Sequence, residues 1–227
     1  LLAAHQGSDG LPPVLQANYI VSSLHWRGKE DAGISDSWIT DSWDRYDIPA
    51  LPPHYDRPGL WNAVNEAIAS GVWRPELHGS FHYDPQRRHE ATLGSEVARA
   101  AAAQGVLLFP GSGQAWELGP WRDDRNLISE LQRSLDIFYQ AFGRPPVSVM
   151  APDYVWDGRC EKIWSQEGLR VIQGKREQRH PSWRRQRTGR LRKVMDRTLA
   201  RLLHTDRVYL ERNAHLEPVQ DESWQQV

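Results

Sequence analysis

Short apolar runs alternate along this chain with segments whose apolar residues recur every three or four positions. The apolar runs are rich in β-branched and aromatic residues and predict buried strands at 14–22, 147–150, 169–173 and from 207 onward. The segments with helical spacing, most of them closed by a glycine, predict helices at 58–70, 89–104, 124–142 and 157–168. Repeated alternation of strand and helix is typical of an α/β domain with a mostly parallel sheet, open or closed into a barrel.

One long polar segment interrupts this alternation. Residues 25–57 combine charged and aromatic side chains with several prolines. We expect them to form a long loop over one end of the sheet, which is where functional residues usually lie.

A second polar stretch, residues 76–84, reads ELHGSFHYD and contains two histidines four positions apart. If the stretch were one strand, His78 and His82 would lie about 13 Å apart. That is too far for two imidazoles to share an ion with bonds of about 2 Å. If the strand ended at His78 and one helical turn followed, the separation would fall to about 6 Å. Gly79 permits such a break, and Ser80 can cap the turn.

A shared metal therefore predicts a strand end at His78 and a turn across 79–83. The alternative is that the two histidines are partly exposed residues on a polar face. In a chain with nine histidines, this spacing also arises by chance.

The composition excludes several classes of protein. The chain has 227 residues, enough for one large domain, and its single cysteine, Cys160, excludes an intrachain disulfide and a cysteine-rich zinc module. A net charge of −1 provides no global field for nucleic acid or a membrane surface. No apolar run approaches the roughly 20 residues of a membrane span, and no secretory signal is present, so a cytoplasmic location is the default expectation.

Two further features have more than one interpretation. The eleven tryptophans predict extensive packing, and some could line a sugar site. The basic stretch 174–193 could bind nucleic acid, but we favour a solvated loop, or a loop that contacts an anionic glycan.

Four segments, taken in order, carry a resemblance to a known family. They are HGSFH at 78–82, RPPVSVMAPDYVWD at 144–157, LRVIQGK at 169–175 and VYLERNAHLEP at 208–218. Together they resemble a divergent branch of the polysaccharide deacetylase superfamily, the NodB-like carbohydrate esterases. The resemblance covers most of residues 10–220. It implies an incomplete or distorted (β/α) barrel of the glycoside hydrolase and deacetylase type, with residues 1–227 as the central portion of a single deacetylase-like domain.

The resemblance also implies a reaction, the hydrolysis of N-acetyl groups from a carbohydrate. A divalent metal, zinc being the expected ion, is held in this family by two histidines and one aspartate. His78 and His82 match the two histidines. Asp153 and Trp156 follow the strand 147–150 at the end where barrel sites form, and we expect them to bind substrate.

Other members of the family's site have no clear match in this chain. No Asp-Asp pair lies on an apolar strand upstream of His78, so we expect the chain to be truncated at both ends. Asp84 and Asp153 are candidates for the third ligand, and His204 and His215 are candidates for the general acid by residue type only. The alternative is a non-catalytic glycan- or metal-binding relative that lacks the catalytic aspartates.

Overall fold

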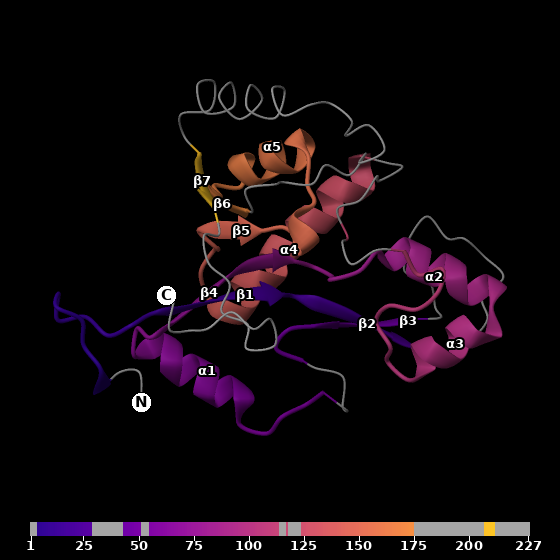
Figure 1. The fold of residues 1–227 in the computed structure, drawn as a ribbon, viewed down its shortest axis with the longest axis horizontal. Helices are drawn as coiled ribbons and strands as arrows, with labels where there is room; N and C mark the ends of the chain where they lie inside the picture. The colour runs from indigo at the N-terminus through magenta and orange to yellow at the C-terminus, as the bar shows by residue number, and fades with distance from the viewer. Residues whose placement is uncertain are drawn as a thin grey trace, which may run out of the picture.

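The computed structural model describes residues 4–28, 43–50, 55–113, 117, 124–174 and 207–211. Five strands within these segments form one parallel sheet in the order β1-β4-β5-β6-β7 (Figure 1). Their bounds are β1 Leu15–Ile20, β4 Trp73–Gly79, β5 Ser148–Met150, β6 Val171–Gly174 and β7 Val208–Glu211. The predicted α/β class is thus confirmed. In this part of the chain the sheet is open, with β1 and β7 as its outer strands.

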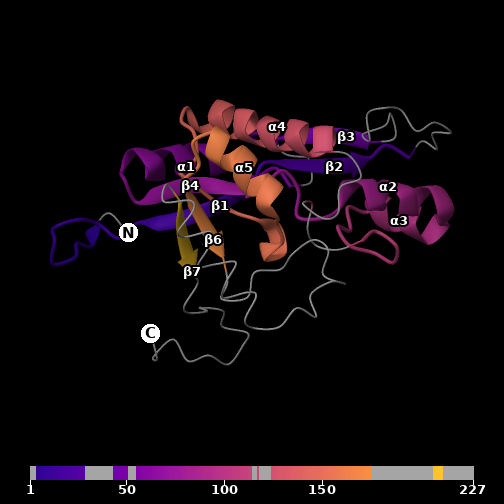
Figure 2. The ribbon, with the colours of Figure 1, turned by 90° about the horizontal axis from the view of Figure 1, so that it is seen from above.

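Three helices precede strands of this sheet in the chain: α1 Leu60–Ala69, α4 Asp124–Phe142 and α5 Gly158–Gln166. Helices α4 and α5 cover one face of the sheet (Figure 2). The apolar stripe predicted for α4 is confirmed, because it packs onto one buried row of strand residues. That row and stripe comprise Leu77, Val149 and Ile172 from the sheet and Leu127, Leu131, Leu135 and Phe138 from α4.

The opposite face of the sheet is curved and carries both polar and apolar side chains. Asn18 alternates with the core residue Tyr19 on β1 and therefore points away from α4 and α5. Gln173 of β6 donates from Nε2 to Asn18 Oδ1 at 3.2 Å and to Ser148 Oγ at 2.8 Å. In a flat sheet, β1 and β6 would lie three strand spacings, or about 14 Å, apart. The contact therefore requires the sheet to curl toward the face that points away from α4 and α5.

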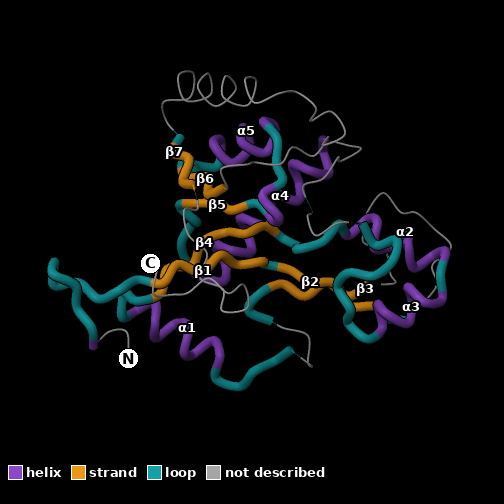
Figure 3. Tube along the Cα trace, in the orientation of Figure 1, coloured by secondary structure: helices purple, strands orange, loops and turns teal. Residues whose placement is uncertain are grey.

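A hairpin lies where we predicted a loop. Strands β2 Ser22–Trp26 and β3 Trp43–Asp47 pair antiparallel, so the prediction of a loop over 25–57 is wrong for these residues (Figure 3). Leu24, Trp26 and Trp43 are buried against Phe81 and Tyr83 in a second apolar cluster. The charged residues of β3 hid its alternation, because one of them, Arg45, is itself buried.

The single helix predicted over 89–104 is two helices. Helix α2, Pro85–Gly94, and helix α3, Glu96–Ala103, are separated by Ser95. Ser95 has an extended backbone, with φ −150° and ψ 123°, and its hydroxyl accepts from the amide of Ala98 to cap α3. None of the helices described is long and apolar enough to cross a membrane.

Candidate metal site

The turn that follows β4 carries both histidines. Strand β4 runs through Gly79, the chain then bends, and α2 begins at Pro85. The break predicted after His78 therefore occurs one residue later. Gly79 adopts φ 109°, and a Cβ at this position would overlap Oε1 of Glu117 and lie 3.3 Å from Pro152 Cδ. Only glycine fits this backbone comfortably.

The turn brings the two imidazoles together. The ring centroids of His78 and His82 lie 5.2 Å apart, with an angle of 52° between the ring planes. A nitrogen–zinc bond of about 2.0–2.1 Å places a ring centroid about 3.2 Å from the ion. Two such rings at a tetrahedral angle have centroids about 5.2 Å apart. The separation of the two ring centroids is therefore compatible with a shared zinc ion.

The ring of His78 is oriented by the neighbouring strand. Its Nδ1 lies 2.6 Å from the carbonyl oxygen of Met150, at the end of β5. A carbonyl can only accept, so Nδ1 carries the proton and Nε2 is left with its lone pair. Burial lowers the pKa of His78 to about 4, more than the Met150 carbonyl raises it, and a charge on His82 would lower it further. His78 is thus a neutral imidazole near pH 7, whereas the side chain of His82 is exposed.

The turn after β5 lies against the histidine turn and is strained. It is the 3₁₀ turn Pro152–Tyr154, in which Asp153 and Tyr154 have φ values of 50° and 59°. Left-handed backbone costs a non-glycine residue roughly 1–2 kcal/mol. Strain of this kind clusters at functional sites. The position of Pro152 beside Gly79 therefore makes this turn a candidate wall of the site.

The remaining predicted site residues have structural partners. Trp156 is only 2% exposed, and its indole donates to Glu161 Oε1 at 2.9 Å while the ring packs against Trp164. Asp84 caps α2 by accepting from the amide of Arg87 at 3.0 Å. Their roles at a site stay predictions.

Among the residues described, no group of three His, Cys, Asp or Glu side chains forms a cluster that could hold a metal. Neither Asp84 nor Asp153 therefore completes the His78–His82 pair here. His204, His215 and residues 175–193 of the basic stretch lie outside the described residues.

Sequence reasoning missed Glu117, which lies next to the histidine turn. Its side chain is 3% exposed, and its carboxylate accepts from the amides of Ser80, at 2.8 Å, and Phe81. Burial raises the pKa of Glu117 well above its usual value, as does the charge of Glu130, while the two amides and Arg45 lower it. The expected cap by Ser80 is wrong: its hydroxyl is buried and has no hydrogen-bond partner in the described structure.

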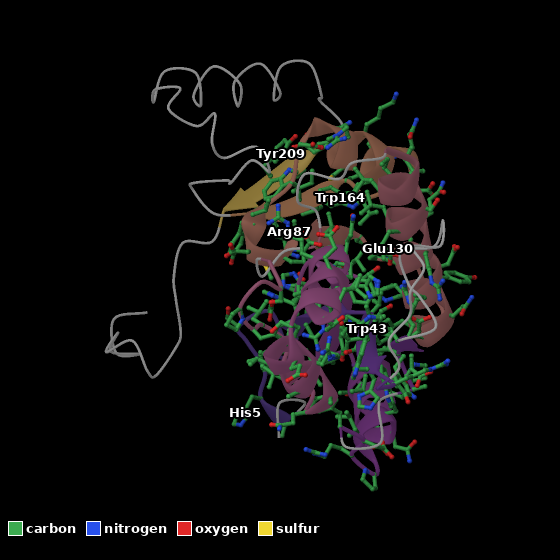
Figure 4. All side chains as sticks on the ribbon, turned by 90° about the vertical axis from the view of Figure 1, so that its right-hand side faces the viewer. His5, Trp43, Arg87, Glu130, Trp164 and Tyr209 are labelled. Carbon is green, nitrogen blue, oxygen red and sulfur yellow. The ribbon has the colours of Figure 1, made fainter. Side chains whose placement is uncertain are left out.

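A network of charged side chains lies near enough to influence this carboxylate. Arg45 of β3 bonds both carboxylate oxygens of Glu130, at 2.9 and 3.1 Å, and also contacts Asp47 and Ser22, each at 2.8 Å. Its guanidinium lies 5.0 Å from the ring centroid of Phe81. Glu130 belongs to α4 and Trp43 to the hairpin, and both are labelled in Figure 4. The network ties the hairpin, α4 and the histidine turn into one unit.

Comparisons with known proteins give one distant similarity. The sequence matches no protein-family model and no curated protein significantly. The structure of IcaB from Ammonifex degensii is similar over 54% of this chain, with a TM-score of 0.35 and 16% sequence identity. The similarity spans 43% of the IcaB chain, less than half of its length.

Proposed function

We propose that this chain is a divergent member of the polysaccharide deacetylase superfamily. In this proposal, His78 and His82 bind a divalent metal, expected to be zinc, and the protein hydrolyses N-acetyl groups of a carbohydrate. The observation that carries the proposal is the His78–His82 pair at the carboxyl end of a parallel strand, with ring centroids 5.2 Å apart. Ligand sites of parallel α/β sheets form at this end of the strands.

The chemistry of the two histidines fits a metal. A metal-binding histidine almost always donates its second ring N–H to a carbonyl or a carboxylate, and His78 does so to Met150. His82 is exposed, so it leaves one side of the pair open to water and substrate. The third ligand is an aspartate by resemblance, and the described residues contain no group of three side chains that would complete the set.

Each part of the turn has a role in the proposed reaction. When bound, the metal supplies Lewis-acid chemistry and lowers the pKa of water. Met150 holds the His78 ring in one orientation, so that Nε2, with its lone pair, is the atom that would bind a metal. The strained Asp153–Tyr154 turn binds substrate beside the pair, and Trp156 anchors that turn in the core through Glu161.

The proposed fold is an incomplete or distorted (β/α) barrel, formed by a single domain over 1–227. The curl that brings Asn18 and Gln173 within 3.2 Å supports it, because a sheet must bend this way to close. The position of helices α4 and α5 on the convex face also fits a barrel.

Acetate release from N-acetylglucosamine oligomers tests the activity. The zinc-loaded chain should release acetate, whereas a chelator, His78→Ala or His82→Ala should reduce the release to background. The closest competing function is a relative that binds glycan without cleaving it, which the lack of a third ligand among the described residues favours. That relative would bind the oligomers, measured by calorimetry, and release no acetate with any metal.

A further inference from the structure

A carboxylate from a distant part of the sequence holds the backbone between the two histidines. Glu117 lies 36 and 37 residues from its two donors, the amides of Phe81 and Ser80. Each carboxylate oxygen takes one amide. The Cα of Gly79 faces the same group so closely that an added Cβ would overlap Oε1. Three consecutive residues between His78 and His82 are therefore shaped around one side chain.

The other edge of the turn is held by the chain that leaves β1. The amide of Val21 donates to the carbonyl of Gly79 at 3.0 Å, and the amide of Ser22 donates to that of Ser80 at 2.9 Å. Phe81 is fully buried beneath the Arg45 guanidinium. The peptide groups of residues 79–81 are thus held by Glu117 on one side and by the amides of Val21 and Ser22 on the other.

We propose that Glu117 is a positioning residue that sets the distance between the two imidazoles. The hydrogen bonds from Ser80 and Phe81 fix the backbone at the point where it leaves β4, and this direction decides where His82 lies relative to His78. The metal part of this inference rests on the proposed function. The contact between Glu117 and the turn consists of hydrogen bonds within the protein and does not depend on a metal.

The chain offers a matched control for a purely stabilising role. Glu76 is also fully buried, and its Oε2 accepts from two consecutive amides, those of Val147 at 2.8 Å and Ser148 at 2.7 Å, while its Oε1 accepts from Arg74 Nε at 2.8 Å. These amides lie at and just before the start of β5, and neither belongs to the turn between His78 and His82. Glu76→Gln therefore perturbs a buried carboxylate that holds two amides, and weakens its ion pair with Arg74, without touching the amides of Ser80 and Phe81.

Two measurements on Glu117→Gln and Glu76→Gln test the inference. In metal-free protein, amide hydrogen exchange at Ser80 and Phe81 should accelerate at least tenfold in Glu117→Gln and stay unchanged in Glu76→Gln. In a zinc titration, Glu117→Gln should weaken binding about 10- to 100-fold, the usual cost of losing a group that orients metal ligands. Glu76→Gln should lower the Tm by a similar amount and leave the zinc Kd unchanged.

The outcomes separate this inference from the proposed function. A Glu117→Gln variant that exchanges slowly at Ser80 and Phe81, or that binds zinc as the wild type does, overturns the positioning role. If the wild type binds no zinc through His78 and His82 while the two amides lose protection in Glu117→Gln, the proposed function fails and the contact stands. Should Glu117→Gln not fold, Glu117→Asp, whose shorter side chain cannot reach both amides, is measured in the same way with the same criteria.

Discussion

Replacing Gly79 by alanine perturbs the histidine turn at its tightest point. Gly79 has φ 109°, and the added Cβ would overlap Glu117 Oε1 and lie 3.2 Å from Cδ of the same residue. Gly168, which follows α5, provides a matched control. It has φ 85°, and no atom lies within 4 Å of an added Cβ.

Both substitutions strain a left-handed backbone, but only Gly79→Ala also breaks hydrogen bonds. Alanine in left-handed backbone costs roughly 1–2 kcal/mol at either position. At Gly79 the methyl group also displaces the Glu117 side chain from two amides, and a buried amide left without its acceptor costs roughly 1–3 kcal/mol. Because the turn relaxes in part, we expect an additional loss of about 3 kcal/mol. Gly79→Ala should thus cost about 4–5 kcal/mol and Gly168→Ala about 1–2 kcal/mol.

Urea unfolding of the two variants measures this difference directly. A cycle with Glu117→Ala isolates its cause, since without the carboxylate the Gly79→Ala cost should fall most of the way to that of Gly168→Ala, with only the contact to Pro152 Cδ at 3.3 Å left over. If Gly79→Ala is no more destabilising than Gly168→Ala, the carboxylate is not held against the turn and the reasoning is refuted.

Two further predictions concern buried groups outside the turn. Glu130→Ala should lower the free energy of unfolding by about 3 kcal/mol, because Arg45 stays buried and keeps only Asp47 and Ser22 as hydrogen-bond partners. The control is Arg133→Ala, which removes an exposed contact to Asp47 and should cost at most about 0.5 kcal/mol in the same urea assay. Equal losses of stability in the two variants would contradict this prediction. Burial raises the pKa of Cys160 to about 12, so at pH 8 only about one folded molecule in ten thousand carries the thiolate, and iodoacetamide should label it far more slowly than in the urea-unfolded chain. Equally fast labelling of Cys160 in the folded and unfolded chains would refute its burial. Because the folded state holds the thiol proton more tightly, the free energy of unfolding should also fall as the pH rises from about 8.5 towards 12.

The elements with a strong apolar period could be predicted from the sequence. Helix α4 has a continuous stripe of leucines and Phe138, and β5 and β6 are short apolar runs, so each appears where the pattern placed it. The β2–β3 hairpin could not be predicted in this way. Its strand β3 reads WDRYD, and the burial of Arg45 depends on Glu130, 85 residues further along.

At the candidate site, too, the local backbone could be predicted from the sequence and the long-range contacts could not. The hypothesis that His78 and His82 share a metal predicted a strand end at His78, and the strand ends at Gly79 with the two rings close together. Glu117 gave no signal, because a single acidic residue says nothing about which amides it will meet more than 30 residues away. Local geometry was readable from the sequence, whereas the contacts that fix it come from distant segments.

Zinc content after dialysis tests the central claim most directly. The wild-type chain should retain one zinc ion, and the His78→Ala/His82→Ala double variant should retain none. His25→Ala, which removes a histidine from β2, serves as the control and should keep the wild-type content. Full zinc content in the double variant would contradict the account, because the pair would then not be the site.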